Sequence, residues 1–119
     1  TVEDSIDVAF VKVSNIYKNF KYKGIRALED DLYEINLRVK NCDEKDEALT
    51  LLRMINTRLA IIDDYIHTEQ LSDKERDRWD NLMNKYRMVR TELSKKSVYD
   101  QKFYGLFVQT PVIKSRYEI

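Results

Sequence analysis

Apolar side chains recur at alternating steps of three and four residues over most of this chain. Four such runs are present: Val2, Ile6, Ala9, Val13, Ile16 and Phe20; Ile25, Leu28, Leu32, Ile35, Val39 and Cys42; Ala48, Leu52, Ile55, Leu59, Ile62 and Ile66; and Trp79, Leu82, Tyr86, Val89 and Leu93. This spacing places each run on one stripe of an α-helix. The sequence therefore predicts an all-α fold, an antiparallel helical bundle of about four helices.

Turn and capping residues separate the four runs. Gly24 can adopt the left-handed conformation after the first helix, Asn41 and Asp43 are N-cap candidates for the third, and Ser72 with Glu75 has the spacing of a capping box. The expected helices cover about residues 3–20, 25–40, 44–68 and 73–96. Because the last two are long and joined by a short loop, we expect them to form a long α-hairpin.

The pattern changes after Ser97, so we divide the chain into a helical bundle (1–97) and an aromatic C-terminal tail (98–119). Thr110 followed by Pro111 predicts extended backbone within the tail. A tail this apolar must pack on something, either its own bundle, a neighbouring subunit or a different partner. The predicted partner-binding residues are Tyr99, Phe103, Tyr104, Leu106 and Phe107.

The distribution of charged residues along the chain suggests an alternative function. The 21 basic and 21 acidic residues leave a formal net charge of zero, which argues against a global positive field for nucleic acid. One local exception is the stretch 18–26, which holds four basic residues, interleaved aromatics and no acid. Such a turn can contact phosphates and stack on a base. The alternative nucleic-acid-binding residues are Lys18, Lys21, Tyr22, Lys23 and Arg26.

Residues for catalysis or metal binding are sparse. The single histidine, His67, has Asp63 and Asp64 at helical spacing, but a carboxylate-bridged metal site in a bundle needs such a motif on two helices. Cys42, the single cysteine, has no histidine near it in sequence, and no glycine-rich phosphate loop or nucleophile elbow occurs. We therefore predict no enzymatic activity, no cofactor, no metal and no small-molecule substrate.

The remaining features favour an intracellular protein that works by contact. No segment is apolar enough to span a membrane, the start TVEDSID lacks the basic residues of a signal peptide, and one cysteine suits a reducing compartment. Abundant Lys, Glu, Tyr, Ile and Asn fit an AT-biased coding sequence, as in many viruses and phages. We predict a soluble cytoplasmic adaptor or small structural component that binds a protein partner or itself.

The heptad assignment also makes separate predictions for two neighbouring positions, the burial of one and the tolerance of the other to substitution. Leu59 occupies a central stripe position of the third helix and should be buried. Arg58, one residue earlier, lies off the stripe and should tolerate alanine within about 0.5 kcal/mol.

Overall fold

The computed structural model describes residues 24–109, and this part of the chain is helical and has no strand. Its elements are the α-helices α2 (Ile25–Lys40), α3 (Lys45–Thr68), α4 (Asp73–Tyr99) and α5 (Leu106–Gln109), with the 3-10 helix η1 (Gln101–Phe103) between the last two. The all-α prediction is confirmed for these residues. The expected helix over residues 3–20 lies outside them.

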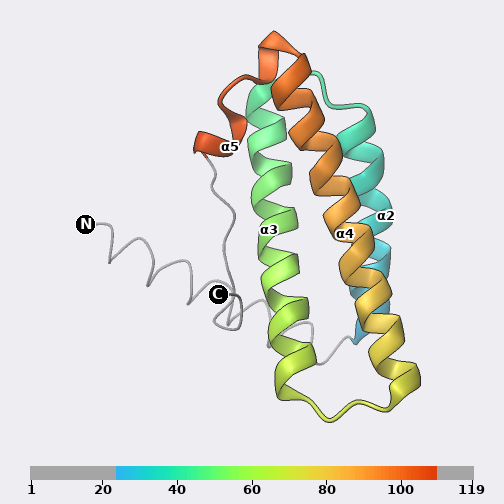
Figure 1. Cartoon of the computed structure of the whole chain (residues 1–119). Helices are drawn as coiled ribbons and strands as arrows, with labels where there is room; N and C mark the ends of the chain where they lie inside the picture. The colour runs from blue at the N-terminus through green and yellow to red at the C-terminus, as the bar shows by residue number, and fades with distance from the viewer. Residues whose placement is uncertain (1–23, 110–119) are drawn as a thin grey trace.

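The three long helices lie side by side, and η1 and α5 follow at the end of α4 (Figure 1). Cross-helix pairs fix the register of α2 against α3. Asp31 pairs with Arg58, whereas Arg38, further along α2, pairs with Glu47 near the start of α3. The two helices therefore run in opposite directions. Within the described residues, none of the helices has the length and apolarity needed to cross a membrane.

The helix starts show which capping signals operate. Ser72 accepts a hydrogen bond from the Glu75 backbone at 3.2 Å, so the predicted capping box of α4 is confirmed. Gly24, which precedes α2, has a φ of +74°, a positive value that glycine adopts readily. The prediction for α3 is wrong, because its N-cap is Glu44 rather than Asn41 or Asp43. Asn41 instead ends α2, and the Asp43 side chain bonds to Lys102.

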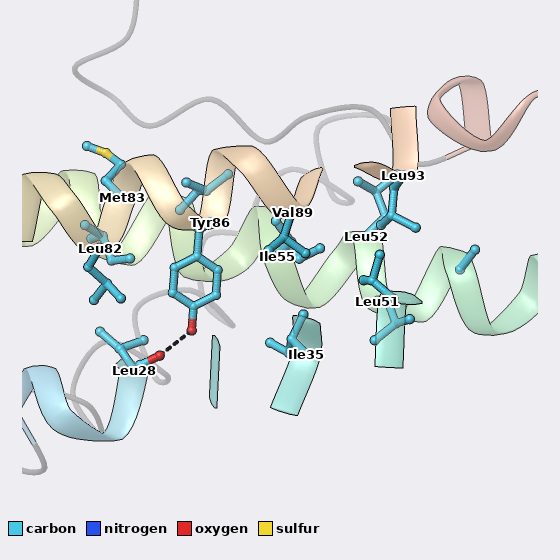
Figure 2. Packing of buried hydrophobic residues seen from close by; sticks show 14 of the residues in the cluster. Leu28, Ile35, Leu51, Leu52, Ile55, Leu82, Met83, Tyr86, Val89 and Leu93 are labelled. Atoms are coloured by element: carbon cyan, nitrogen blue, oxygen red, sulfur yellow. Dashed lines mark hydrogen bonds between the residues drawn. The ribbon is translucent and has the colours of Figure 1, made fainter. Parts of the chain in front are cut away.

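The predicted stripes within the described residues face a common hydrophobic core (Figure 2). Every stripe position of α3 and α4 is buried, and in α2 only Ile25 and Leu32 are partly exposed. Burying each large apolar side chain contributes about 1.5–3 kcal/mol relative to leaving it in water. Tyr86 lies fully inside this core, where its hydroxyl donates to the Leu28 carbonyl at 2.6 Å.

Helix α3 is buried over a wider arc than one heptad stripe. Besides the predicted positions, it buries Leu51, Asn56, Ala60, Ile61 and Asp63. Helix α3 packs against α2, α4 and α5 (Figure 1). A single stripe describes a helix with one buried face, so the periodicity located the central row of α3 and missed the flanking ones.

Candidate interaction surface

The C-terminal segment docks on the long helices through two apolar anchors. Phe103, in η1, is 2% exposed, and Leu106, at the start of α5, is fully buried. Both belong to the same hydrophobic cluster as the stripes of α2, α3 and α4, and Phe107 is partly buried against it. In its described part, up to Gln109, the tail contains two short helical elements rather than extended chain. Thr110, Pro111 and the following residues lie outside the described range.

Two lysine contacts hold this segment to the turn between α2 and α3 and to the start of α3, and a third lysine, Lys96 of α4, bonds to the same turn region. Lys45 donates to the Tyr104 carbonyl at 2.6 Å, and Lys102 bonds to the Asp43 carboxylate at 2.9 Å. Lys96 donates at 2.9 Å to the carbonyls of Val39 and Cys42, and its ammonium lies 5.5 Å from the Phe103 ring centroid. The Lys96 ammonium therefore hydrogen-bonds carbonyls at the C-terminal end of α2 and also lies close to the Phe103 ring.

The Asp43–Lys102 pair shifts the titration of both groups. The hydrogen bond from Lys102, together with its positive charge, lowers the pKa of Asp43 below its ordinary value of 3.8. The same bond and the charge of Asp43 raise the pKa of Lys102 above 10.5. Both side chains are largely exposed, so salt screens this attraction. The pair orients the segment more than it stabilises it.

Other apolar side chains of this segment, and of the last turn of α4 just before it, are exposed. We call them the exposed C-terminal group: Val98 (59% exposed), Tyr99 (84%), Tyr104 (54%) and Val108 (86%). The described residues hold three other large exposed hydrophobics, Tyr33, Leu37 and Met88. More than half of these side chains are thus concentrated within residues 98–108. Exposed apolar side chains that adjoin one another on a surface are a recognised sign of an interaction site, so this stretch is the candidate.

The structure separates the five predicted partner-binding residues into two kinds. Phe103 and Leu106 are core residues, and Phe107 packs partly on the core. Tyr99 and Tyr104 are available at the surface. Val98 and Val108 were not in the predicted set. Sequence reasoning had no signal for them beyond their apolar character, because their exposure depends on how the segment docks.

The predicted nucleic-acid-binding residues are mostly outside the described range. Lys18, Lys21, Tyr22 and Lys23 precede it, and only Arg26 is placed, exposed in the first turn of α2. Glu29, Asp30 and Asp31 follow it on the same helix. The basic turn therefore stays a prediction.

A partly buried polar cluster crosses the helices where the stripes predict apolar contacts alone. The Arg58 side chain is 14% exposed and lies 3.3 Å from the Asp31 carboxylate. Burial raises the pKa of the adjacent Tyr86 above its ordinary value of 10.0, and the charge of Arg58 opposes that rise. The tolerance of Arg58 to alanine stays a prediction, and this burial and ion pair argue against it. The long Arg58 side chain reaches across to α2 from a position beside the stripe.

Two further polar residues of α3 are buried. Asp63 lies next to His67, whose Nδ1 is 2.7 Å from the Asp63 carbonyl and 3.5 Å from its carboxylate. Asn56 is fully buried. Among residues 24–109, no group of three or more histidine, cysteine or acidic side chains is arranged to hold a metal ion.

Comparison with known proteins finds no match to a family model, a curated protein or a solved structure.

Proposed function

We propose that this chain is a non-enzymatic protein–protein interaction or assembly protein that binds its partner through the exposed C-terminal group. The observation that carries this proposal is the division of one short segment into buried anchors and exposed apolar side chains. Phe103 and Leu106 are buried in the core, while Tyr104 and Val108 are exposed, as is Tyr99 at the end of α4. A segment that needed only to cover its own core would bury its aromatics instead.

The anchors and lysine contacts favour binding by restricting the segment before a partner arrives. Lys102 holds η1, and Lys45 holds the Tyr104 carbonyl between η1 and α5. Ordering a loop on association costs free energy, so a segment already docked loses less. Tyrosine adds a large apolar ring with a polar hydroxyl, which makes it frequent among residues that dominate binding energy. Tyr99 and Tyr104 are therefore the proposed contact centre.

The remaining parts of the proposal concern the whole chain. The sequence has a single histidine and a single cysteine, Cys42, which is buried; this composition supports a non-enzymatic role in a reducing cytoplasm. We also propose that the heptads of residues 2–20 complete an antiparallel four-helix bundle. The support is that Ala60 and Ile61 of α3 are buried without belonging to the hydrophobic cluster shared by α2, α3 and α4.

Deleting residues 1–20 tests the four-helix arrangement. The deletion should lower the free energy of unfolding and speed hydrogen exchange of the α3 amides around Ala60 and Ile61. Unchanged exchange at these amides would contradict it.

Photo-crosslinking tests the proposed contact. A photoreactive residue placed at position 99 or 104 should give the same discrete cross-linked product in extracts of the source cells. Asn81 and Asn84, exposed positions on α4, are matched controls and should not give it. The double variant Tyr99→Ser/Tyr104→Ser should compete poorly for the same partner while keeping its thermal melt. These substitutions are preferable to truncation after Ser97, which would remove Phe103 and Leu106 from the core.

Two results would contradict the proposal. One is a product that forms equally from positions 81 and 104. The other is full competition by the double serine variant.

A further inference from the structure

The outer face of α2 holds a second regular stripe, opposite the one that faces the core. Its members follow one another at steps of four, three, four and three residues and are all exposed: Arg26, Asp30, Tyr33, Leu37 and Lys40. This is the spacing that places side chains in a single row along a helix. Buried Leu28, Ile35 and Val39 occupy the other side of the same helix. Helix α2 therefore has two such rows, and within residues 24–109 only the inner one is covered.

An apolar pair lies at the centre of the outer stripe. Tyr33 is 71% exposed and Leu37 is 43% exposed, and at a separation of four residues they are neighbours on the helix surface. Single exposed apolar residues are common on proteins, but a seam of heptad spacing with its large apolar residues in the middle is typical of a helix that packs on another helix. The charged residues lie at its two ends.

The apolar pair and a pair of opposite charges are both arranged symmetrically about the level of Ile35 on the helix. Tyr33 and Leu37 lie two residues to either side of it, and Asp30 and Lys40 lie five residues to either side. At 1.5 Å per residue these offsets are about 3 Å and about 7.5 Å. A second α2 helix running antiparallel across this point would place Tyr33 against Leu37 and Asp30 against Lys40. A parallel partner would instead place Asp30 against Asp30.

We propose that a second copy of this chain covers the outer face of α2, with the two α2 helices antiparallel about a twofold axis at Ile35. Such an axis turns each pair into two equivalent contacts, so Tyr33 meets Leu37 twice and Asp30 meets Lys40 twice. The same stripe supplies both halves of every pair. That self-complementarity in shape and charge is the reason to choose an identical copy over a different protein.

The length of α2 limits the affinity expected of this dimer. Helix α2 has 16 residues and is about 24 Å long, so the interface is at the small end of specific ones. The dimer should form only at high concentration. The proposal uses none of the exposed C-terminal group, so it stands or falls separately from the proposed partner-binding function.

Mass measurements on the full chain give the first test. The mass by light scattering or sedimentation should rise with concentration from 14.3 kDa toward twice that value. Leu37→Glu should weaken association at least about tenfold, because it places a charge in both central contacts. The matched control is Asp80→Lys, a charge reversal at an exposed position of α4, which should leave association unchanged. A chain that stays monomeric at every accessible concentration would overturn the proposal.

Charge exchange gives the sharper test. Asp30→Lys and Lys40→Glu should each weaken self-association, by about tenfold, since each creates two like-charge contacts. The double variant should recover it, because both pairs are reversed together. Mixing the two single variants should produce a heterodimer, since each then supplies the charges that the other needs.

These outcomes are specific to the antiparallel seam. A dimer that forms equally well in both single variants, or single variants that do not associate when mixed, would show that another surface or register is used. Each substituted side chain is exposed, and thermal melts of all variants verify that they remain folded.

Discussion

The core between α2, α3 and α4 and the C-terminal segment 100–109 are both apolar, but they are held in different ways. Long helices contribute many interleaved side chains to the core, including Leu59 and Tyr86. The segment has two buried anchors, Phe103 and Leu106, and depends on lysine contacts for its orientation. Fewer buried contacts mean that the segment can open while the rest stays folded. That difference predicts a lower local stability for the segment than for the core.

The largest effect should come from truncating the core. Leu59→Ala removes a side chain that is 7% exposed in the centre of α3, and a cavity there should lower the free energy of unfolding by about 2–5 kcal/mol. Urea unfolding followed by circular dichroism measures the loss. Arg53→Ala, at an exposed position of the same helix, is the control and should stay within about 0.5 kcal/mol of the parent. Equal losses would mean that the stripe assignment is wrong.

A matching truncation in the segment should behave differently. Phe103→Ala removes an anchor that is 2% exposed, yet we expect a global loss below the about 3–5 kcal/mol typical of a buried phenylalanine. The segment can detach locally and so limit the cost to its own docking energy. Hydrogen exchange should accelerate at the amides of Phe103, Tyr104 and Val108, which bond within the segment. Exchange that accelerates equally in α3 would show that segment and core unfold as one unit.

Arg58 tests whether the core depends on polar contacts as well as apolar ones. Arg58→Met keeps most of the side-chain volume but leaves Asp31 without this ion pair, so a loss of about 1–3 kcal/mol is expected. Asp31→Asn in the same background should add little, because the two side chains form one contact. A double-mutant cycle in urea measures this coupling. Additive losses from the two substitutions would show that the pair contributes no coupling energy.

The sequence predicted the features that depend on local periodicity. The bounds of α2, the capping box of Ser72 and the buried rows of α3 and α4 all follow from spacing within one helix. The features that it missed depend on distant neighbours. The long side chain of Arg58 reaches a residue 27 positions away. Lys96 caps α2 across 57 positions, although its place suggested only the end of its own helix.

The candidate site was predicted less well for a related reason. Composition located the aromatic segment, but it could not predict that Phe103 is buried whereas the next residue, Tyr104, is exposed. Their difference arises in the turn after η1, where Lys45 holds the Tyr104 carbonyl. A short non-periodic element gives no sequence rule for which side faces the core.

The smallest effect concerns the exposed contact between Lys102 and Asp43. Because the pKa of Asp43 is lowered in the folded state, its contribution is present above its ordinary value of 3.8 and is lost as the pH falls through the folded value. Lys102 has a raised pKa, so its contribution is present below 10.5 and is lost as the pH rises through the folded value. The attachment should thus be complete at neutral pH and weaken toward both extremes.

Titration of Asp43 by NMR tests this contact directly. Lys102→Gln removes the hydrogen-bonding ammonium, so the pKa of Asp43 should rise toward 3.8. Lys95→Gln is the matched control, since Lys95 pairs with Glu92 within α4 and should leave Asp43 unchanged. Added salt should raise the pKa of Asp43 in the parent chain and have little effect in Lys102→Gln. An Asp43 pKa that is the same in both chains would mean that the segment is oriented by Lys45 and its two anchors without this pair.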